Sequence, residues 1–266
     1  MRGDIRVVPL YSSSEGNSTL VTVNGHHILI DCGKNCKQCG LALQKAGVYP
    51  DDIEAVFLTH AHSDHISGIA VFMKKYLTPV YGTKHTLFKI GTDYTDLLHE
   101  IDEKSVTVFD EFGFRVLSYP THHDVTGSVI YRIENTKSGA SVCVMTDLGY
   151  VTEGMLEFCG GCDGGLFESN YDPHMLETGP YDYYLKKRIK GNGGHISNEE
   201  CAQLLEYLLA GGTTKFILGH ISPINNTPSI ARGTVTGYLE SKGYVDGVDY
   251  ELQTAPKSEP GRGIEI

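Results

Sequence analysis

Histidine and aspartate side chains are concentrated in one short segment, residues 58–65 (LTHAHSDH), which has the pattern H-x-H-x-D-H. Imidazole and carboxylate groups suit Zn²⁺, Mn²⁺ or Fe. In an extended turn, residues i and i+2 point the same way, so His60 and His62 can bind one ion. Asp64 and His65 then face another direction. The spacing therefore favours two neighbouring ions over one ion with four ligands.

The flanking residues place this segment on a strand-to-helix turn. Residues 53–58 are β-branched and aromatic and predict a buried strand, whereas residues 66–76 have the apolar spacing of a helix. Such turns are the usual location of functional sites in α/β proteins. The alternative is a surface loop that happens to be rich in histidine. Four possible ligands directly after the end of one strand favour the metal site over this alternative.

The H-x-H-x-D-H pattern resembles the signature of the metallo-β-lactamase-fold hydrolases. The resemblance implies further ligands downstream, and His123, Asp147 and His220 fit them, each following an apolar strand. His122 is the alternative to His123. Asp147 would bridge two ions, since a carboxylate can give one oxygen to each. The implied sets are His60, His62 and His123 for one ion, and Asp64, His65, Asp147 and His220 for the other.

The same resemblance implies the fold. It predicts an α/β protein with a four-layer αββα sandwich, in which the metals lie at one edge of two sheets. We expect residues 1–266 to form a single domain of this kind. Asp31 ends an apolar strand, where a carboxylate can cap a loop or orient a ligand histidine. In the resembled superfamily this aspartate is normally not a direct metal ligand.

Hydrophobic periodicity and turn signals predict the remaining elements. Strands are predicted at 5–10, 19–23, 27–31, 79–82, 128–133, 141–145, 164–168, 215–218 and 249–253, with two more inside 106–118. Helices are predicted at 38–47, 152–159 and 180–189, and from Ser197 to the Gly211-Gly212 stop, with a last helix ending near Lys242. Ser197 and Glu200 form a capping box. We expect residues 84–104 to be mixed and solvated, and the tail 255–263 to be loose.

Four further segments resemble the YycJ/WalJ-type branch of these hydrolases. They are residues 12–18 (SSSEGNS), the pair His123-Asp124, residues 192–198 (NGGHISN) and residues 219–228 (GHISPINNTP). This likeness spans nearly the whole chain and implies a 5′–3′ exonuclease acting on single-stranded DNA. One departure is Tyr171, which stands where the branch usually has histidine, so a contact in that loop can differ.

A mechanism follows as a hypothesis. A metal-bridging hydroxide attacks phosphorus while the ions stabilise the developing charge. Asp64 accepts the proton of that water, and His195, oriented by Glu168, protonates the leaving oxygen. His195 lies just before the cap of a predicted helix, where the helix dipole lowers its pKa. The alternative for His195 is an ordinary loop histidine.

Substrate contacts are predicted around the same site. A hydroxyl-rich turn can offer donors to an anion, and a basic run can hold a phosphate backbone, although such runs are usually solvated helix faces. The predicted contacts are Ser13, Ser14, Asn17, Lys187, Arg188 and Asn225.

Composition limits the possible partners. The net charge of −11 argues against a broad basic track for duplex nucleic acid, although two divalent ions would reverse the charge locally. The chain has no apolar run long enough to span a membrane, and Met1-Arg2-Gly3-Asp4 leads directly into a strand. We expect a cytoplasmic protein without a membrane partner, acting on single-stranded nucleic acid.

The seven cysteines are odd in number and scattered, which favours reduced thiols over disulfides. A zinc knot formed by Cys36-x-x-Cys39 and Cys159-x-x-Cys162 is the weaker alternative.

Two other functions remain open from the sequence. One is a hydrolase of small phosphodiesters or thioesters, similar to glyoxalase II, although we find no clear C-terminal module for glutathione. The other is a metal-holding regulatory protein without catalysis. The sequence also leaves the oligomeric state and the physiological metal open.

Overall fold

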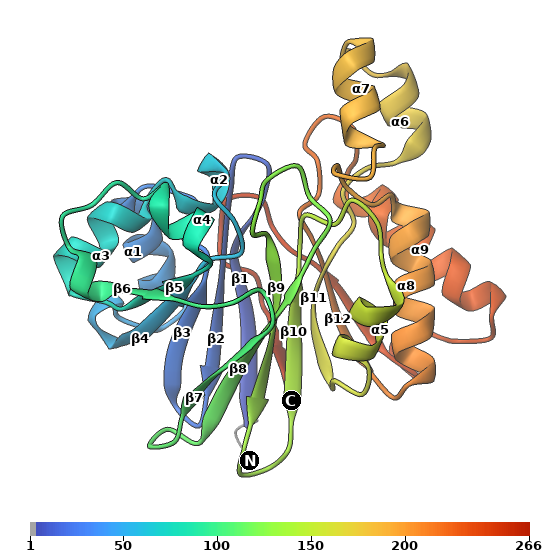
Figure 1. The fold of residues 1–266 in the computed structure, drawn as a ribbon. Coiled ribbons are helices and arrows are strands. Elements are labelled where there is room, and N and C mark those ends of the chain that lie inside the picture. The colour runs from blue at the N-terminus through green and yellow to red at the C-terminus, as the bar shows by residue number, and fades with distance from the viewer. Residues whose placement is uncertain (1–3) are drawn as a thin grey trace.

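Two β-sheets packed face to face form the centre of the protein, and helices cover both outer faces (Figure 1). The computed structural model describes residues 4–266. Met1, Arg2 and Gly3, which begin the segment expected to lead directly into a strand, lie outside the described residues. No helix among residues 4–266 is long and apolar enough to cross a membrane.

The first sheet has the strand order β14-β1-β2-β3-β4-β5-β6. Its strands are β1 (Ile5–Ser13), β2 (Gly16–Val23), β3 (His26–Ile30), β4 (Ile53–Phe57), β5 (Val80–Gly82), β6 (Leu98–Glu100) and β14 (Ile264–Glu265). Its associated helices are α1 (Cys36–Lys45), η1 (Pro50–Asp52), α2 (Ser63–Ile66), α3 (Ile69–Tyr76), α4 (Lys84–Phe88) and η2 (Thr95–Leu97). The turn Asn24-Gly25 joins β2 to β3, and both residues have positive φ.

The second sheet has the order β13-β12-β11-β10-β9-β8-β7. Its strands are β7 (Ser105–Phe109), β8 (Phe114–Pro120), β9 (Val129–Asn135), β10 (Ser141–Met145), β11 (Gly164–Glu168), β12 (Lys215–Gly219) and β13 (Glu251–Thr254). The helices on this side are α5 (Glu153–Cys159), α6 (Pro173–Thr178), α7 (Tyr183–Ile189), α8 (Asn198–Ala210) and α9 (Pro228–Ser241).

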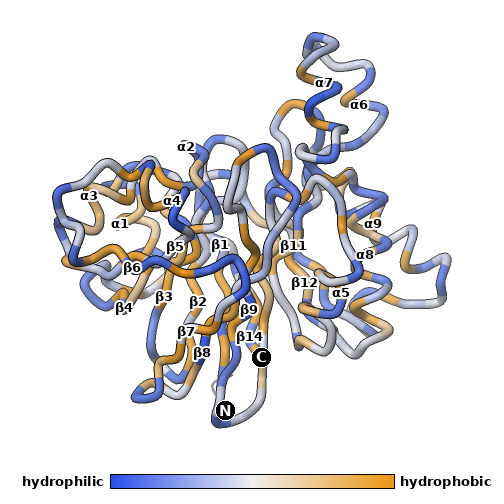
Figure 2. Tube along the Cα trace, viewed as in Figure 1, coloured by the Kyte–Doolittle hydropathy of each residue, from blue (hydrophilic) through white to orange (hydrophobic). Residues whose placement is uncertain are grey.

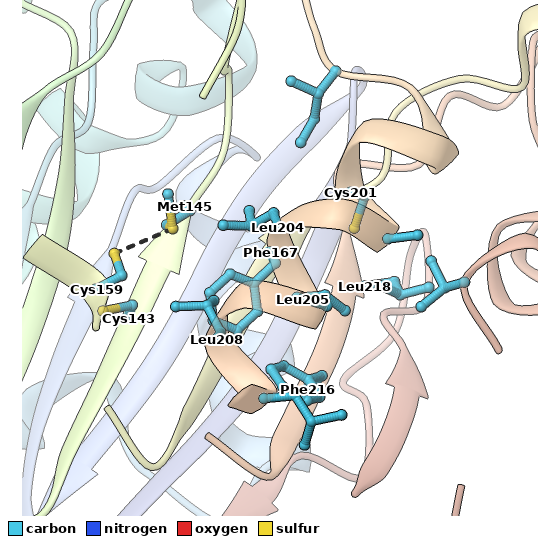
Figure 3. Close-up of a cluster of buried hydrophobic side chains, with 14 of the residues drawn as sticks. Cys143, Met145, Cys159, Phe167, Cys201, Leu204, Leu205, Leu208, Phe216 and Leu218 are labelled. Carbon is cyan, nitrogen blue, oxygen red and sulfur yellow. Dashed lines mark hydrogen bonds between the residues drawn. The ribbon is translucent and has the colours of Figure 1, made fainter. Parts of the chain in front are cut away.

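Three apolar layers hold the four structural layers together. Residues of both sheets, such as Phe57 and Tyr131, form the core between the sheets. Side chains of α1 and α3 pack on the outer face of the first sheet, and those of α5, α8 and α9 pack on the second (Figure 3). Figure 2 shows hydrophobic colouring along the strands. The predicted four-layer αββα sandwich is confirmed.

Helix α8 begins where the capping box predicts. The Ser197 hydroxyl accepts from the Glu200 amide at 3.2 Å, and the Glu200 carboxylate accepts from the Ser197 amide at 2.7 Å. Two orphan amide groups at the helix start are thereby satisfied, which fixes the residue from which α8 departs. His195, two residues earlier, is positioned by this start.

The predicted helix 66–76 is divided in the structure. A single turn, α2, carries Asp64 and His65, and α3 starts only at Ile69. Gly68 lies between them, and a β-carbon on Gly68 would lie 2.0 Å from the Lys34 carbonyl oxygen. The break therefore allows the loop after β3 to approach the metal-binding turn closely.

Two peripheral segments contain contacts that the sequence did not predict. Residues 98–100 inside the predicted mixed segment form β6, which pairs with β5. In the tail 255–263 the Gly261 amide donates to the Pro9 carbonyl, and directly after the tail β14 pairs with β1. Both strands, β6 and β14, are very short. Pairing with a neighbouring strand, rather than the local sequence pattern, therefore determines whether they form.

Candidate metal centre

Three histidine nitrogens face one another at the ends of β4 and β8. His62 Nδ1 lies 3.0 Å from His60 Nε2 and 3.2 Å from His123 Nε2. Burial is the main cause that lowers the pKa of His60, His62 and His123, so these rings are neutral near pH 7. Three neutral nitrogens directed at one point make a cation-binding group, which we call the first group.

The second nitrogen of each of these histidines has an oxygen partner. His60 Nδ1 lies 3.0 Å from Thr59 Oγ1, and His123 Nδ1 lies 3.1 Å from the Gly194 carbonyl oxygen. His62 Nε2 lies 3.2 Å from Asp124 Oδ1. An N–H at each outer nitrogen leaves the inner nitrogen free as a ligand.

A second group of donors lies beside the first. His65 Nε2 is 3.2 Å from Asp147 Oδ2 and 3.4 Å from Asp64 Oδ2. His220 Nδ1 is 3.4 Å from Asp147 Oδ2. The other oxygen of Asp147, Oδ1, is 3.6 Å from His123 Nε2 in the first group. Asp147 thus presents one oxygen to each group, which is the arrangement that a bridging carboxylate requires.

Asp31 is buried behind this second group. Its Oδ2 accepts from His65 Nδ1 at 2.7 Å and from Thr59 Oγ1 at 2.8 Å, while Oδ1 accepts from the Thr59 amide at 2.8 Å. The contact with His65 holds Nε2 toward Asp147. The structure therefore places Asp31 where it orients a ligand rather than binding an ion directly.

Two buried polar atoms indicate that the second group fits a cation. Asp147 Oδ2 and His220 Nδ1 have no hydrogen-bond partner within residues 4–266. Burial lowers the pKa of His65, but the carboxylates of Asp147 and Asp31 outweigh it and raise that pKa well above its ordinary value. The group thus attracts a proton where a cation would otherwise bind.

The backbone contributes to this geometry at three strand ends. Asp31, Asp147 and His220 follow β3, β10 and β12, and their φ angles are 66°, 61° and 51°. Left-handed conformations cost non-glycine residues about 1–2 kcal/mol and persist where the surroundings determine them. In each case the turn directs a polar side chain out of an apolar strand and into the site.

His195 and Glu168 adjoin the second group. His195 Nδ1 lies 2.7 Å from Glu168 Oε1, and Glu168 Oε2 accepts from the Leu148 amide at 2.7 Å. Burial raises the pKa of Glu168 well above its usual range and lowers that of His195. His195 lies between the rings of His123 and His220, with centroids 5.4 and 5.2 Å away. It therefore lies beside both groups and keeps its Nε2 available.

The predicted contacts in the β1–β2 turn separate into two kinds. Asn17 is buried, and its Nδ2 lies 3.2 Å from Asp64 Oδ2 and 3.0 Å from His65 Nε2. Ser13 is buried and accepts from the Glu15 amide, whereas Ser14 is exposed. Asn17 thus contacts predicted ligands, and Ser14 faces solvent at the tip of the turn.

The other predicted contacts lie around α7. Lys187 is exposed, and Arg188 Nε donates to Asp124 Oδ2 at 2.5 Å. Asn225 is only 1% exposed, and its side-chain oxygen lies close to Gly179. Substrate roles for these three residues stay predictions. Tyr171, the departure noted in the sequence, packs in the small apolar cluster at the base of α6 and α7.

Sequence analysis missed the partners that anchor the ligands. Thr59 bonds both Asp31 and His60, and Asp124 joins His62 to Arg188. Thr59 gave no sequence signal beyond standing next to His60. Asp124 was noted only as part of the pair His123-Asp124, without its contacts. Gly194 acts through its carbonyl group, so its side-chain type gave no signal at all.

The cysteines do not form the zinc knot considered from the sequence. Cys36 and Cys39 pack on the outer face of the first sheet, whereas Cys159 and Cys162 pack on that of the second. All seven thiols are buried and free. The two pairs lie in opposite layers, so one ion cannot bind both.

Comparison with known proteins identifies similar sequences and structures. The profile of the beta-lactamase superfamily domain matches residues 26–221. Exodeoxyribonuclease WalJ of Streptococcus pneumoniae is 32% identical over 254 residues, which cover 93% of each chain. Exodeoxyribonuclease YycJ of Bacillus anthracis is 32% identical over 257 residues, covering 93% of this chain and 94% of that protein.

A solved structure has the same arrangement. The metallo-beta-lactamase fold protein YhfI from Bacillus subtilis superposes with a TM-score of 0.70, at 17% identity, over 97% of this chain and 98% of that one. At this identity the likeness shows the fold.

Proposed function

This chain belongs to the beta-lactamase superfamily, in the branch of the exodeoxyribonucleases WalJ and YycJ, and we propose that it degrades single-stranded DNA as a metal-dependent 5′–3′ exonuclease. The observation that carries the proposal is the two donor groups that share Asp147. Alignment over nearly the full length of two exodeoxyribonucleases supports DNA as the substrate. A DNA substrate agrees with the predicted cytoplasmic location, which stays a prediction.

We propose two divalent ions, with Zn²⁺, Mn²⁺ and Fe as the candidates. The proposed ligands are His60, His62 and His123 for one ion and Asp64, His65 and His220 for the other, with Asp147 shared. Divalent ions there supply an activated water near neutral pH and counter-charge for the phosphate. The unpartnered Asp147 Oδ2 and His220 Nδ1 support this assignment.

Asp64 is the proposed proton acceptor. Burial raises the pKa of its carboxyl group, but the adjacent His65 outweighs burial and lowers it below the usual value. Asp64 is therefore ionised at neutral pH. Asn17 holds its Oδ2 at 3.2 Å, so the carboxylate has a fixed direction at the edge of the site.

His195 is the proposed proton donor to the leaving 3′ oxygen. The Glu168 carboxyl group, 2.7 Å from Nδ1, orients the ring and leaves Nε2 as the atom for proton transfer. The pKa of His195 is lowered mainly by burial, which makes the protonated ring a stronger acid. The amide of His195 donates to the Ile189 carbonyl at 2.9 Å, so the end of α7 fixes the position of the ring.

The test is digestion of a single-stranded DNA oligonucleotide in the presence of Mn²⁺, with His60→Ala as the control. A substrate labelled at the 5′ end should release labelled mononucleotide from the start of the reaction, and one labelled at the 3′ end should shorten progressively. Duplex DNA and an RNA of the same sequence should be cut more slowly. His60→Ala should be inactive because the first group loses a ligand.

The opposite result would change the assignment. Wild-type protein that binds both metals but leaves every oligonucleotide intact would not be an exonuclease. Hydrolysis of bis(p-nitrophenyl) phosphate or of a thioester would then indicate a small-molecule hydrolase. Metal binding without turnover of any ester would indicate the regulatory alternative.

A further inference from the structure

Helices α6 and α7 form a hairpin that projects from the sandwich between β11 and α8 (Figure 1). We call residues 173–190 the arm. A small apolar cluster of its own holds the arm together, formed by Tyr171, Leu176 and Ile189 with Tyr181 and Leu185 packed against them. The arm therefore has a defined inner side, and its remaining residues are free to present other chemistry.

Two tyrosines on the arm are left outside this cluster. Tyr183 is 71% exposed and Tyr184 is 82% exposed, and their rings lie 5.7 Å apart at 75°. Single exposed aromatic residues need no explanation, but two adjacent rings on a projecting helix offer a large stacking surface. Figure 2 shows the surrounding part of α7 in the hydrophilic colour. The rings are thus presented to solvent among polar side chains.

A basic groove borders one of these rings. A cavity of about 350 Å³ is lined by Glu177, Tyr183, Lys186, Lys187, Lys190 and Gly191. Lys190 pairs with the Glu177 carboxylate, and Lys186 donates to the Glu177 carbonyl at 2.7 Å. Lys187 has no ion-pair partner within residues 4–266 and is exposed. Lys187 therefore shares this groove with Tyr183 while its charge is unpaired in the described part of the chain.

The root of the arm is joined to the metal centre. Arg188 Nε donates to Asp124 Oδ2 at 2.5 Å, and Asp124 Oδ1 lies 3.2 Å from His62 Nε2. Tyr184 and Arg188 are four residues apart on α7 and therefore share a face, about 6 Å apart along the axis. A polymer that leaves the site past Arg188 reaches Tyr184 within one helical turn.

We propose that the arm binds the single-stranded part of the DNA, with bases stacked on Tyr183 and Tyr184 and a phosphate at Lys187. Aromatic rings stack on any base and basic side chains follow the backbone, so the pair suits unpaired strands without sequence preference. Bases in a duplex are already stacked on one another and cannot use the rings. The proposal rests on the proposed function, because it gives the arm the same substrate as the metal centre.

Equilibrium binding tests the arm separately from catalysis. The probe is a fluorescein-labelled, phosphorothioate-linked oligothymidylate of about 20 nucleotides, which resists hydrolysis, and the readout is anisotropy with the metal-loaded protein. The double variant Tyr183→Ala/Tyr184→Ala should bind at least about tenfold more weakly. Tyr183→Phe/Tyr184→Phe should bind like the wild type, because phenylalanine keeps the stacking face.

The control Tyr49→Ala removes a ring that is 67% exposed on the first sheet's side of the molecule and should change nothing. An oligonucleotide of the same length with abasic sites identifies the stacking contribution. The wild type should bind this abasic oligonucleotide more weakly than oligothymidylate. The double alanine variant should bind the two oligonucleotides equally well. Equal affinity of the wild type for both probes would overturn the stacking role.

Salt dependence tests the phosphate contact. Each phosphate contact on a single strand contributes about −0.7 to the slope of log K against log salt. Lys187→Ala should therefore reduce the slope by about 0.7. Lys137→Ala, an exposed lysine in the β9–β10 turn at the other end of β10 from Asp147, should leave it unchanged. An unchanged slope in Lys187→Ala would show that Lys187 does not contact a phosphate of the strand.

The two proposals fail in different ways. If the wild-type protein does not bind the phosphorothioate strand, the proposed DNA-binding role of the arm is wrong, whatever the protein's activity on other esters. Binding that depends on the two tyrosines, without digestion of ordinary single-stranded DNA, would support the arm and contradict the exonuclease.

Discussion

At the scale of single residues, the site consists of side chains that are each held at two points. His65 shows this most clearly, because Asp31 accepts a hydrogen bond from Nδ1 and leaves Nε2 directed at Asp147. His60, His62 and His123 repeat the arrangement with Thr59, Asp124 and the Gly194 carbonyl. Oxygen partners of this kind set both the tautomer and the direction of a ligand ring. We therefore expect the proposed activity to depend on residues outside the proposed ligand set as well.

The first prediction concerns Asp31. Asp31→Asn keeps the shape and accepts the positive φ of 66°, but its NH2 group replaces one of the two acceptor oxygens. Either the Thr59 amide loses its acceptor, or His65 Nδ1 and Thr59 Oγ1 lose theirs. Metal affinity should fall about 10- to 100-fold. Turnover should recover at saturating metal, as a positioning role requires. Metal titration by calorimetry measures this, with the exposed Asp52→Asn as control. Unchanged affinity would show that Asp31 does not orient the ligand.

The second prediction concerns His195. His195→Ala should reduce turnover about 10²- to 10⁴-fold, because the leaving oxygen loses its proton donor. Metal content should change little, since the ligands proposed for both ions remain. Elemental analysis and single-turnover digestion measure the two effects in one preparation. His99→Ala, an exposed histidine on β6, is the control. Equal loss of metal and turnover would mean that His195 is a ligand instead.

At the scale of elements, glycine marks where backbones approach closely. A β-carbon on Gly194 would lie 2.1 Å from the Ile189 carbonyl oxygen, whereas Gly233 and Gly237 on α9 have open space around that position. Gly194 thus permits the contact between the end of α7 and the loop that carries His195. The two α9 glycines lie in the interior of a helix, and no close backbone contact there requires glycine.

The third prediction follows from this contrast. Gly233→Ala and Gly237→Ala should each stabilise the protein by about 0.5–1 kcal/mol, because alanine loses less backbone entropy in a helix. The melting temperature should rise by about 1–4 °C per substitution, without loss of activity. Gly194→Ala should lower both melting temperature and turnover. Thermal melts together with DNA digestion distinguish these cases, and destabilisation by either α9 substitution would contradict the helix argument.

At the scale of the whole molecule, the metal centre exists because two sheets meet. The first sheet supplies the ligands after β4, and the second supplies those after β8, β10 and β12. A hydrogen bond from the His220 amide to Ser12 Oγ, 2.7 Å long, joins the two sheets at this edge. Metal binding should therefore couple to the stability of the entire fold.

The fourth prediction tests this coupling. Ions that bind only the folded state at 100 times their dissociation constant stabilise it by about 2.7 kcal/mol. A chelator should therefore lower the melting temperature of the metal-loaded protein by several degrees. His60→Ala/His220→Ala, which loses one ligand in each group, should show a much smaller chelator effect. An equal shift in the variant would place the stabilising metal elsewhere.

The sequence by itself determined which residues are candidate ligands and where each stands on its element. Apolar periodicity marks strands locally, so a histidine or aspartate at the end of a strand could be recognised without knowing its neighbours. One predicted turn was enough to place four candidate ligands together, because they are close in sequence: His60, His62, Asp64 and His65. The four-layer fold followed from the same patterns together with the family resemblance.

Only the tertiary structure decided how these residues face one another. The Gly194 carbonyl anchors His123 from 71 residues away, and Asp31 orients His65 from 34 residues away. It also decided that Asn225 is buried while Tyr183 and Tyr184 are exposed on a projecting arm. Exposure and ring orientation depend on packing between distant segments, and a local sequence pattern contains no information about those contacts.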